Sequence, residues 1–472
     1  YIKIYLYLSN SVLFNSHCSM YRTVLKSKID FHKSIIQARE VNMNQLAEEL
    51  NAVLAGTVAE RLFSEMGRRM YFPKGIITQS AEAGEKAYRF NATIGMAYEH
   101  GQPMMLDALR AELPGLTPTE AVAYASTGGI PELRKTWKES LYRKNPSLNG
   151  KKISLPTVVP GLTAAVSYIC DMFVEPGDTV ILPDLHWPNY RLIVEERKSA
   201  AGITYPLFAG KGYNIEGLLE GVRQASQRRG KAIIILNFPN NPTGYSLTLD
   251  EADRVTAGLL EIAQQGTDIL VIADDAYFGL QYEDNLLCES MFARLADLHP
   301  NILAIKADGP TKEDYVWGFR IGFVTFGAAG FGDEHYEALA KKLLGIIRSS
   351  VSSSSSLSQN LLLKALKYQG YEAQKARYRE ILKGRYKAMK KKLAEMTLPD
   401  GFTPMPFNSG YFMSFRCDGF SAEALRKKLL NEKGIGTVSL MDRYLRVAFS
   451  SVEESDISDL CDVIAQAVVE LR

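Results

Sequence analysis

After about residue 151, short apolar runs alternate regularly with helical patterns, and this order restricts the folds that the chain can adopt. The runs are nearly all apolar, which is typical of strands that are covered on both faces of a sheet. They are TVILP (179–183), KAIIILN (231–237), DILVIAD (268–274), NILAIKA (301–307) and RIGFVTF (320–326). The helical patterns lie near 163–174, 190–199, 214–229, 248–265 and 333–347. This order predicts an α/β domain with a mainly parallel sheet, in which ligands bind outside the carboxyl ends of the strands.

A different order of elements follows, and it predicts a second, smaller α+β domain. One long helical pattern covers about 357–396, and the strand patterns GYFMSFR (410–416) and YLRVAFS (444–450) each precede a further helical pattern. We expect four parts: an atypical N-terminal extension (1–42), an N-terminal helix and arm that join the small domain (43–100), a large domain (101–356) and a small C-terminal domain (357–472).

The first 42 residues differ in composition from the rest of the chain. They are rich in Tyr, Ile, Ser and Lys, and their acidic residues are Asp30 and Glu40. Such a segment is either a transit peptide, which is typically basic and poor in acidic residues, or translated upstream sequence. We favour translated upstream sequence, because Met43 opens an amphipathic helical pattern.

Charge, cysteine and histidine usage narrow the classes of function. The formal net charge of +2 gives no electrostatic reason to expect a nucleic-acid or membrane partner. The five cysteines are scattered and lack CxxC spacing, which argues against a disulfide framework and favours a reducing, cytoplasmic compartment. The six histidines form no ligand pair, so we expect no catalytic metal.

Lys312 is a candidate for covalent chemistry because of its place in the sequence. Most lysines are surface residues, and Lys306 is a competing candidate in the same region. Lys312 lies in the turn after NILAIKA, whereas Lys306 lies inside that strand pattern, and Arg320 follows Lys312 by eight residues. A lysine that forms a Schiff base must lie partly desolvated at the mouth of the sheet, which favours Lys312.

Two blocks that close strand patterns contain polar candidates. NFPNNPTG (237–244) is rich in turn-forming residues, but eight of them in this order also indicate a site where the amide of Asn241 meets a cofactor oxygen. DDAYFG (274–279) places carboxylates at the end of a buried strand, where they are costly unless they are paired. Either they form a structural ion pair or helix cap, or Asp274, with Tyr277 three residues later, pairs with a cationic pyridine nitrogen.

Three further candidates are weaker when each is taken alone. The glycine turn of PGLTAA (160–165) leads into a helical pattern, and such a turn can hold a phosphate through backbone N–H groups. Trp187 is either a core residue or an aromatic ring that stacks on a planar cofactor. Arg446, in YLRVAFS, is either solvated or binds a substrate carboxylate through both arms of its guanidinium.

Together these segments resemble the class I/II aminotransferases, which are fold-type I pyridoxal-phosphate (PLP) enzymes. The resemblance covers about residues 90–472, and it rests on the N-P-T-G block, the D-x-A-Y block, the lysine with an arginine eight residues later, and the late arginine. It implies an α/β fold with a mainly parallel seven-stranded sheet sandwiched by helices, and a smaller α+β domain. It also implies pyridoxal 5′-phosphate as the cofactor and a homodimer with shared active sites.

The resemblance implies a catalytic or substrate-binding role for several residues. Lys312 resembles the lysine that holds the cofactor, and Asp274 resembles the partner of its pyridine nitrogen. Asn241 and Tyr277 resemble the pair that binds its phenolic oxygen. Trp187 resembles the stacking aromatic residue, and it and Asn241 are also expected to contact the substrate. Arg446 resembles the residue that binds the α-carboxylate.

The remaining residues are implied at the phosphate and at the N-terminal side of the substrate. Those implied at or near the phosphate of the same chain are Gly161, Leu162, Thr163, Thr311 and Arg320. Tyr124 resembles the tyrosine that reaches the phosphate of the neighbouring subunit, and Gly95 resembles a backbone contact to the substrate.

The chain departs from the family pattern in three places. Gly309 stands where the family often has a serine, so one phosphate contact is expected to be missing or replaced by water. Asn360 lies near the place where dicarboxylate-specific relatives have an arginine, which puts a preference for aspartate or glutamate in doubt. The segment around Tyr98 and His100 also departs from the usual G-E-P-D form.

The implied activity is the transfer of an amino group between an amino acid and a 2-oxo acid by a ping-pong mechanism. A PLP-dependent carbon–sulfur β-lyase on the same scaffold is an alternative, because removal of the α-proton is common to both. A PLP-fold transcriptional regulator is a more distant one, because residues 1–42 are too short for a helix-turn-helix domain. The sequence does not identify the amino donor or acceptor.

Overall fold

The computed structural model describes residues 43–54, 76–93, 97–100, 102–104, 106–112 and 115–472. The chain divides into two compact units, 1–72 and 73–472. In the first unit, the described helix is α3 (Gln45–Leu54), which begins just after Met43 as predicted. The predicted extension 1–42 and Gly95 lie outside the described residues.

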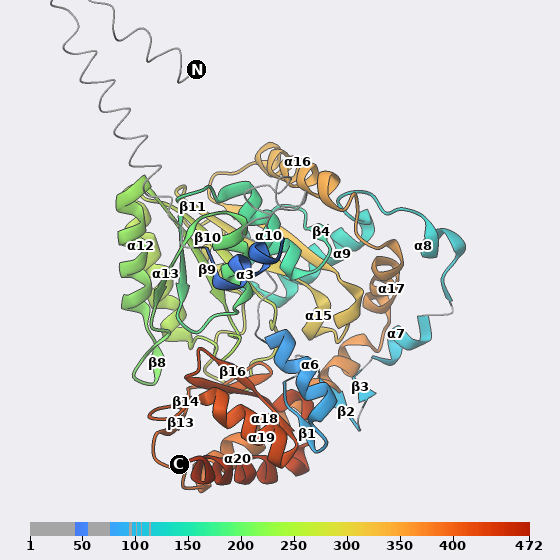
Figure 1. Ribbon diagram of the computed structural model, residues 1–472. Helices are drawn as coiled ribbons and strands as arrows, with labels where there is room; N and C mark the ends of the chain where they lie inside the picture. The colour runs from blue at the N-terminus through green and yellow to red at the C-terminus, as the bar shows by residue number, and fades with distance from the viewer. Residues whose placement is uncertain (1–42, 55–75, 94–96, 101, 105, 113–114) are drawn as a thin grey trace, which may run out of the picture. The chain divides into compact units, whose positions relative to one another are not determined.

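A seven-stranded sheet lies at the centre of the second unit (Figure 1). Its strand order is β4-β12-β11-β10-β9-β5-β6. Its strands are β4 (Thr157–Val159), β5 (Thr179–Pro183), β6 (Ala201–Tyr205), β9 (Lys231–Asn237), β10 (Asp268–Asp274), β11 (Ile302–Asp308) and β12 (Gly322–Ala328). The strands from β6 to β11 pair in parallel, whereas β12 is antiparallel to both β11 and β4. The predicted seven-stranded, mainly parallel sheet is confirmed.

Helices cover both faces of this sheet, because successive side chains of each buried strand point to opposite faces. On β9, Ile234 and Leu236 join one hydrophobic core, and Ile233 and Ile235 join the other. Helices of the first core include α9 (Pro131–Lys144), α12 (Ile215–Arg229), α13 (Leu249–Gln264) and α14 (Met291–Leu295). Helices of the second core include α10 (Leu162–Phe173) and α16 (Asp333–Ser350). The two cores explain why these strands are apolar throughout.

A four-stranded antiparallel sheet lies in the C-terminal part, with the order β13-β14-β17-β16. The strands are β13 (Phe402–Pro404), β14 (Phe412–Cys417), β16 (Val438–Leu440) and β17 (Tyr444–Ala448), and the helices around them are α18 (Tyr371–Glu395), α19 (Ala422–Lys433) and α20 (Ile457–Leu471). Strand β1 (Phe90–Asn91) pairs with β15 (Ile435–Gly436), and the Gln79 amide of α6 (Ile76–Lys86) donates to the Ser439 carbonyl at 3.2 Å. Residues 76–91 therefore lie beside the C-terminal elements.

The remaining elements are short and connect these parts. The helices are α7 (Asp107–Glu112), α8 (Pro118–Val122), α11 (Asn189–Arg191), α15 (Pro310–Glu313) and α17 (Ser356–Lys367). The strands are β2 (Tyr98–Glu99), β3 (Gln102–Pro103), β7 (Phe208–Ala209) and β8 (Gly212–Tyr213). The helical turns are η2 (Pro146–Leu148), η3 (Leu192–Arg197), η4 (Trp317–Phe319), η5 (Phe449–Ser451) and η6 (Glu454–Asp456).

The prediction of one long helix over 357–396 is wrong, because the structure has two helices there. Helix α17 ends at Lys367 and α18 begins at Tyr371, with a tight turn between them in which the Tyr371 amide donates to the Tyr368 carbonyl. Apolar residues have helical spacing on both sides of the turn. Gly370 is therefore the only residue in the sequence that indicates a break between two helices.

No helix among the described residues is long and apolar enough to cross a membrane.

Candidate active site

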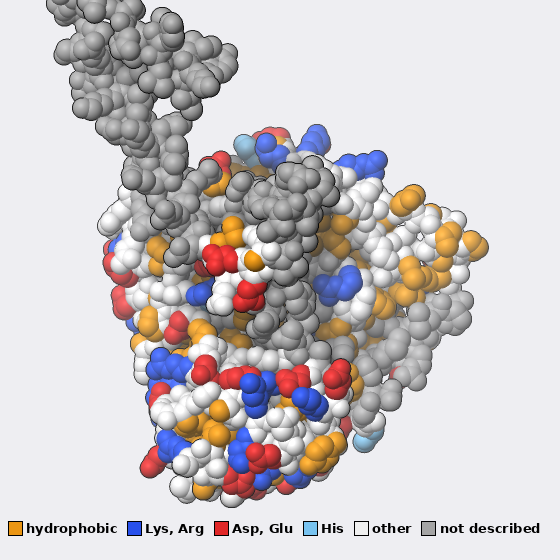
Figure 2. All heavy atoms as spheres, in the orientation of Figure 1, with side chains coloured by type: hydrophobic (Ala, Val, Ile, Leu, Met, Phe, Trp, Pro, Cys, Tyr) orange, Lys and Arg blue, Asp and Glu red, His pale blue; other side chains and the backbone are white. Residues whose placement is uncertain are grey.

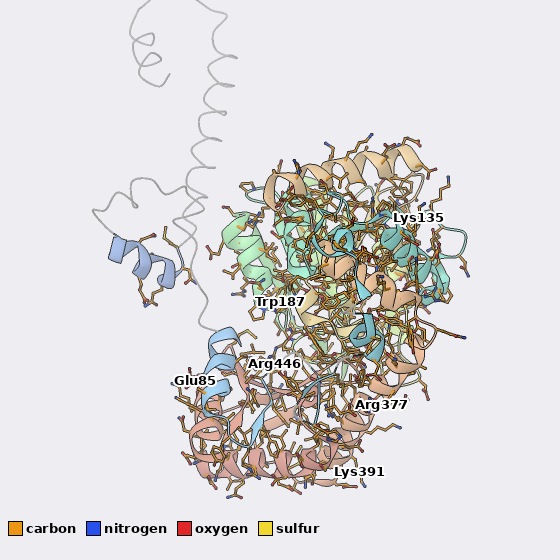
Figure 3. The ribbon with its side chains drawn as sticks, turned by 90° about the vertical axis from the view of Figure 1, so that its right-hand side faces the viewer. Glu85, Lys135, Trp187, Arg377, Lys391 and Arg446 are labelled. Atoms are coloured by element: carbon orange, nitrogen blue, oxygen red, sulfur yellow. The ribbon has the colours of Figure 1, made fainter. Side chains whose placement is uncertain are left out.

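The segments that follow β5, β9, β10 and β11 meet around one cavity of about 140 Å³, at the carboxyl ends of these strands. Its walls are Leu162, Thr163, Trp187, Tyr190, Asn237, Asn241, Asp274, Ala276, Tyr277, Thr311, Lys312 and Arg320. In Figure 3, Trp187 lies on the part that contains the seven-stranded sheet, and Arg446 lies on the C-terminal part below it. The sequence thus predicted most of the residues that the fold brings together here.

Lys312 and Asp274 are opposed ionisable groups in this cavity. Lys312 lies on the short helix α15, and its Nζ is 4.9 Å from the centre of the Tyr277 ring. Burial and, to a smaller extent, Arg320 lower the pKa of Lys312, the Asp274 carboxylate raises it, and the net result is a pKa of about 8. Burial raises the pKa of Asp274 to about 6, against the effects of a Tyr190 hydrogen bond and of Lys312. The lysine is therefore close to the neutral form that a nucleophile or base requires near pH 8.

Tyr190 and Asn237 orient Asp274, although neither residue was predicted to do so. The Tyr190 hydroxyl donates to Asp274 Oδ2 at 2.5 Å, and the Ala276 amide donates to Oδ1 at 3.1 Å. The Asn237 side-chain amide donates to the Asp274 carbonyl at 2.9 Å. Tyr190 follows Trp187 by three residues, and Asn237 is the first residue of NFPNNPTG, so their places beside known candidates were the available signals.

Lys306 and Asp275 form a separate buried ion pair, which removes the two competing candidates from the cavity. The Lys306 ammonium contacts the Asp275 carboxylate and lies 3.6 Å from Asp308 Oδ2. In the parallel pairing of β10 with β11, Asp274 lies opposite Ala307 and not opposite Lys306. The structure therefore gives Lys306 the structural ion-pair role and leaves Asp274 and Lys312 as the opposite charges in the wall of the cavity.

The start of α10 and the residues around it form a pocket suited to an anion. Gly161 precedes this 12-residue helix with a φ of 90°, and a Cβ there would lie 2.4 Å from Arg320 Nη2. The helix N-terminus and Arg320 both favour negative charge. The buried Thr311 hydroxyl has no hydrogen-bond partner among the described residues, which fits a site that is completed by a bound phosphate.

Gly309 has a steric reason to differ from serine. A Cβ at this position would lie 2.7 Å from the carbonyl oxygen of Ile321 and 3.1 Å from the Gly322 Cα. A serine would thus collide with backbone, while the unpartnered Thr311 hydroxyl lies two residues away in the cavity wall.

Arg446 lies on β17 next to Asn241, with 2% of its surface exposed. Its Nη1 donates to Asn241 Oδ1 at 3.0 Å, its Nη2 donates to the Thr93 carbonyl at 3.1 Å, and its guanidinium lies 4.2 Å from the centre of the Phe412 ring. Burial lowers its pKa to about 10. Asn241 thus connects this guanidinium directly to the cavity, because Asn241 is part of the cavity wall.

Tyr124 lies away from this cavity, with 96% of its surface exposed. The prediction that it reaches the site of a neighbouring subunit stays a prediction.

The sequence over residues 96–464 matches the family model described as aminotransferase class I and II. The chain belongs to this family. Class I and II aminotransferases are PLP-dependent enzymes, so the predicted family, fold class and cofactor are confirmed. The Thr311 hydroxyl, the Gly161 turn and the opposed Lys312 and Asp274 all fit that cofactor.

Relatives within the aminotransferase family match this chain over part of their length. A probable aspartate/prephenate aminotransferase of Aquifex aeolicus is 30% identical over 52% of this chain and 56% of its own length. An aspartate aminotransferase of Bacillus sp. is 28% identical over 44% of this chain and 49% of its own length. The chain therefore matches about half the length of these two curated relatives.

Solved structures of aminotransferases share the fold over most of the chain. An Anaerococcus prevotii aminotransferase superposes with a TM-score of 0.77 at 24% identity, covering 87% of this chain and all of that one. A Pyrococcus horikoshii kynurenine aminotransferase gives a TM-score of 0.71 at 20% identity, covering 88% of this chain and 98% of that one. These similarities support the fold.

Proposed function

We propose that the chain is a PLP-dependent aminotransferase that moves an amino group between an amino acid and a 2-oxo acid. The observation that carries the proposal is the meeting of Lys312 and Asp274 in one cavity whose wall, through Asn241, contacts the guanidinium of Arg446. When it is bound, the cofactor supplies an aldehyde for the amine and a ring that accepts electrons.

The protein's own groups have separate tasks in this proposal. Lys312 holds the cofactor through its amine, and the released amine then takes and returns the α-proton of the substrate. Asp274, held by Tyr190, keeps a proton on the pyridine nitrogen through its negative charge. Arg446 binds the α-carboxylate with both arms of its guanidinium.

The resemblance to the family implies roles for other residues of the cavity wall, for Gly161 and for Gly95, which lies outside the described residues. Asn241 and Tyr277 bind the phenolic oxygen of the cofactor, and Trp187 stacks on its ring. The phosphate is held by Gly161, Leu162, Thr163, Thr311 and Arg320. Gly95 is the proposed backbone contact to the substrate.

We infer that the protein acts as a homodimer in which Tyr124 of each chain completes the site of the other. Hydrophobic side chains are exposed around α8, where Val122 and Tyr124 have 84% and 96% of their surface exposed (Figure 2). A surface of this kind favours contact with another chain. A cytoplasmic location and a division into large (101–356) and small (357–472) domains remain part of the proposal.

A neutral side chain on the amino donor is favoured over an acidic one. At the place where dicarboxylate-specific relatives have an arginine, the Asn360 amide donates to the Glu120 carbonyl at 2.8 Å and is part of the packing of α17 on α8. The names of the relatives in contrast include aspartate. A panel of amino donors, each assayed with 2-oxoglutarate and with pyruvate, distinguishes neutral from acidic donors. Formation of pyruvate and ammonia from a cysteine-type substrate without an acceptor would instead support the β-lyase.

The proposal is tested by reducing the PLP-loaded protein with borohydride and mapping the modified lysine by mass spectrometry. We expect the adduct on Lys312, and we expect the Lys312→Ala variant to fold, to form no adduct and to lose turnover. An adduct on Lys306, or wild-type turnover in Lys312→Ala, would refute the assignment.

A further inference from the structure

Lys144, Glu313, Asp314 and Lys375 form a cluster of ions whose side chains are 1% to 19% exposed, and the proposed function gives this ion cluster no role. Glu313 Oε1 lies 2.7 Å from Lys144 Nζ and 2.8 Å from Lys375 Nζ. Asp314 Oδ1 lies 2.7 Å from Lys375 Nζ. Burial opposes the charge on Glu313, but the two lysines outweigh it and lower its pKa to about 2. Two cations thus neutralise two carboxylates in the two residues that follow Lys312.

The helix that carries Lys312 depends on its neighbours for its position. Helix α15 has four residues, and a helix of about one turn has little stability of its own. The Tyr411 hydroxyl donates to the Lys312 carbonyl at 3.1 Å, which fixes one backbone group. The ion pairs of the cluster fix the side chains of Glu313 and Asp314, which follow Lys312. The ion cluster therefore helps to hold α15 in place.

The two lysines of the ion cluster come from different parts of the fold. Lys144 is the last residue of α9, which packs on the seven-stranded sheet. Lys375 lies near the start of α18, where the Tyr378 ring also packs on the Tyr315 ring with 5.0 Å between centres. Helix α18 therefore holds the turn after Lys312 by both charge and aromatic contact.

The same helix also contacts the segment that follows Arg446. Arg385, on α18, is buried, and its Nη1 donates to the Ser450 carbonyl at 2.6 Å. Ten residues of helix, or about 15 Å, separate it from Lys375. A single helix thus touches the chain next to the lysine and next to the guanidinium of the proposed site.

We propose that Lys375 is a positioning residue that keeps the amine of Lys312 in its buried place opposite Asp274. The proposal rests on the proposed function of Lys312. Without Lys375, Glu313 keeps Lys144, but the Asp314 carboxylate loses the cation that neutralises it and keeps only the neighbouring hydroxyl of Tyr371. The turn then loosens and water reaches the Lys312 amine. The pKa of the amine consequently moves toward that of an exposed lysine.

The test measures the amine of Lys312 in the full-length protein without cofactor. Acetic anhydride labels neutral amines, and mass spectrometry gives the labelling of Lys312 as a function of pH. The groups that face this amine are Asp274, Tyr277 and Arg320, and they are unchanged in every variant. We expect a wild-type midpoint near 8 and, in Lys375→Met, a midpoint about one pH unit higher, because the desolvation that lowers the pKa is reduced. PLP binding should weaken several-fold in the same variant.

Three further variants separate positioning from general stability. Lys375→Arg should restore the midpoint. Lys391→Met, at a position on α18 with 75% of its side chain exposed, should leave the midpoint unchanged. The double variant Lys375→Met with Asp314→Asn removes the unpaired carboxylate, so it should recover melting temperature while it keeps the raised midpoint.

Two results would overturn the proposal. One is a Lys375→Met variant that melts earlier but labels Lys312 with the wild-type midpoint. The other is a double variant whose midpoint returns to the wild-type value, since the effect would then come from an unpaired charge. Both are distinct from failure of the proposed function, which would appear as a wild-type protein that forms no borohydride adduct at Lys312.

Discussion

At the scale of single residues, the pKa values of the ionisable groups in the site depend on two opposing effects, burial and the charges of neighbouring side chains. Lys312 and Asp274 each favour the charged form of the other, while burial favours the neutral form of both. Arg320 acts on Lys312 in the opposite sense to Asp274. Besides burial, one carboxylate and one guanidinium on different segments thus determine the pKa of the Lys312 amine.

Asp274→Asn and Arg320→Gln should shift the pKa of Lys312 in opposite directions in the protein without cofactor. Loss of the carboxylate removes a group that raises this pKa, so the labelling midpoint of Lys312 should fall below about 8. Loss of the guanidinium removes a group that lowers it, so the midpoint should rise. Amine labelling against pH measures both shifts, and shifts of the same sign would contradict this account.

Gly309→Ser should destabilise the protein even though serine is frequent at this position in the family. The new Cβ would lie 2.7 Å from the Ile321 carbonyl oxygen, so backbone must move. Overpacking of this kind costs about 1–3 kcal/mol in the free energy of unfolding, which urea titration measures. Gly345→Ser is the matched control, since a Cβ there meets no atom within 4 Å. Equal stability of the two variants would show that the turn relaxes freely.

The sequence predicted residue types at the site better than it predicted their contacts. Lys312, Asp274, Asn241 and Tyr277 were predicted from their places after strand patterns, and the structure puts them in one cavity. The hydrogen bond from Tyr190 was not predictable, because it joins segments 84 positions apart in the sequence.

At the scale of elements, the strands that are buried on both faces were the easiest to predict. The patterns 179–183, 231–237 and 268–274 coincide with β5, β9 and β10. Strand β6 was not predicted, because it lies at the edge of the sheet and residues 201–204 are exposed or half-buried, so it lacks a continuous apolar run. The antiparallel direction of β12 was not predictable from its residues, because the direction of a strand is set by how the chain returns to the sheet.

Thr248→Ala should remove the N-terminal cap of α13 and lower the free energy of unfolding by about 1 kcal/mol. The Thr248 hydroxyl accepts from the Glu251 amide at 3.2 Å, and the Glu251 carboxylate accepts from the Thr248 amide at 2.9 Å. Thr256→Ala is a control in the same helix, because the Thr256 hydroxyl only donates to the Ala252 carbonyl one turn earlier. Denaturant titration compares the two, and an equal loss in both would contradict the capping role.

At the scale of the whole molecule, the candidate site draws on both sheets of the unit 73–472. The ends of β9 and β10 and the segments that follow β4, β5, β9, β10 and β11 supply the cavity residues, and β17 supplies Arg446. A cofactor bound there therefore favours the folded arrangement of both sheets over any state in which they separate.

PLP should stabilise the whole chain in proportion to its binding. At a free concentration one hundred times its dissociation constant, it should raise the free energy of unfolding by about 2.7 kcal/mol. Thermal melting at increasing PLP concentrations measures this. Pyridoxal, which lacks the phosphate, is the control and should raise the melting temperature less at equal concentration. Equal effects of the two would show that the pocket at the start of α10 does not bind the phosphate.

The reversed direction of β12 has a consequence for how the chain can change in length. Because β12 is antiparallel to β11, β12 begins beside the carboxyl end of β11. Arg320 precedes β12 by two residues and therefore lies on the same side of the sheet as Lys312. Lys312 and Arg320 can therefore line one cavity although they are only eight positions apart. A parallel strand would begin beside the amino end of β11, and the chain would need a crossover of a dozen or more residues to reach that position. Insertions or deletions between Lys312 and Arg320 should consequently be tolerated far less than those in the surface loops of the same sheet.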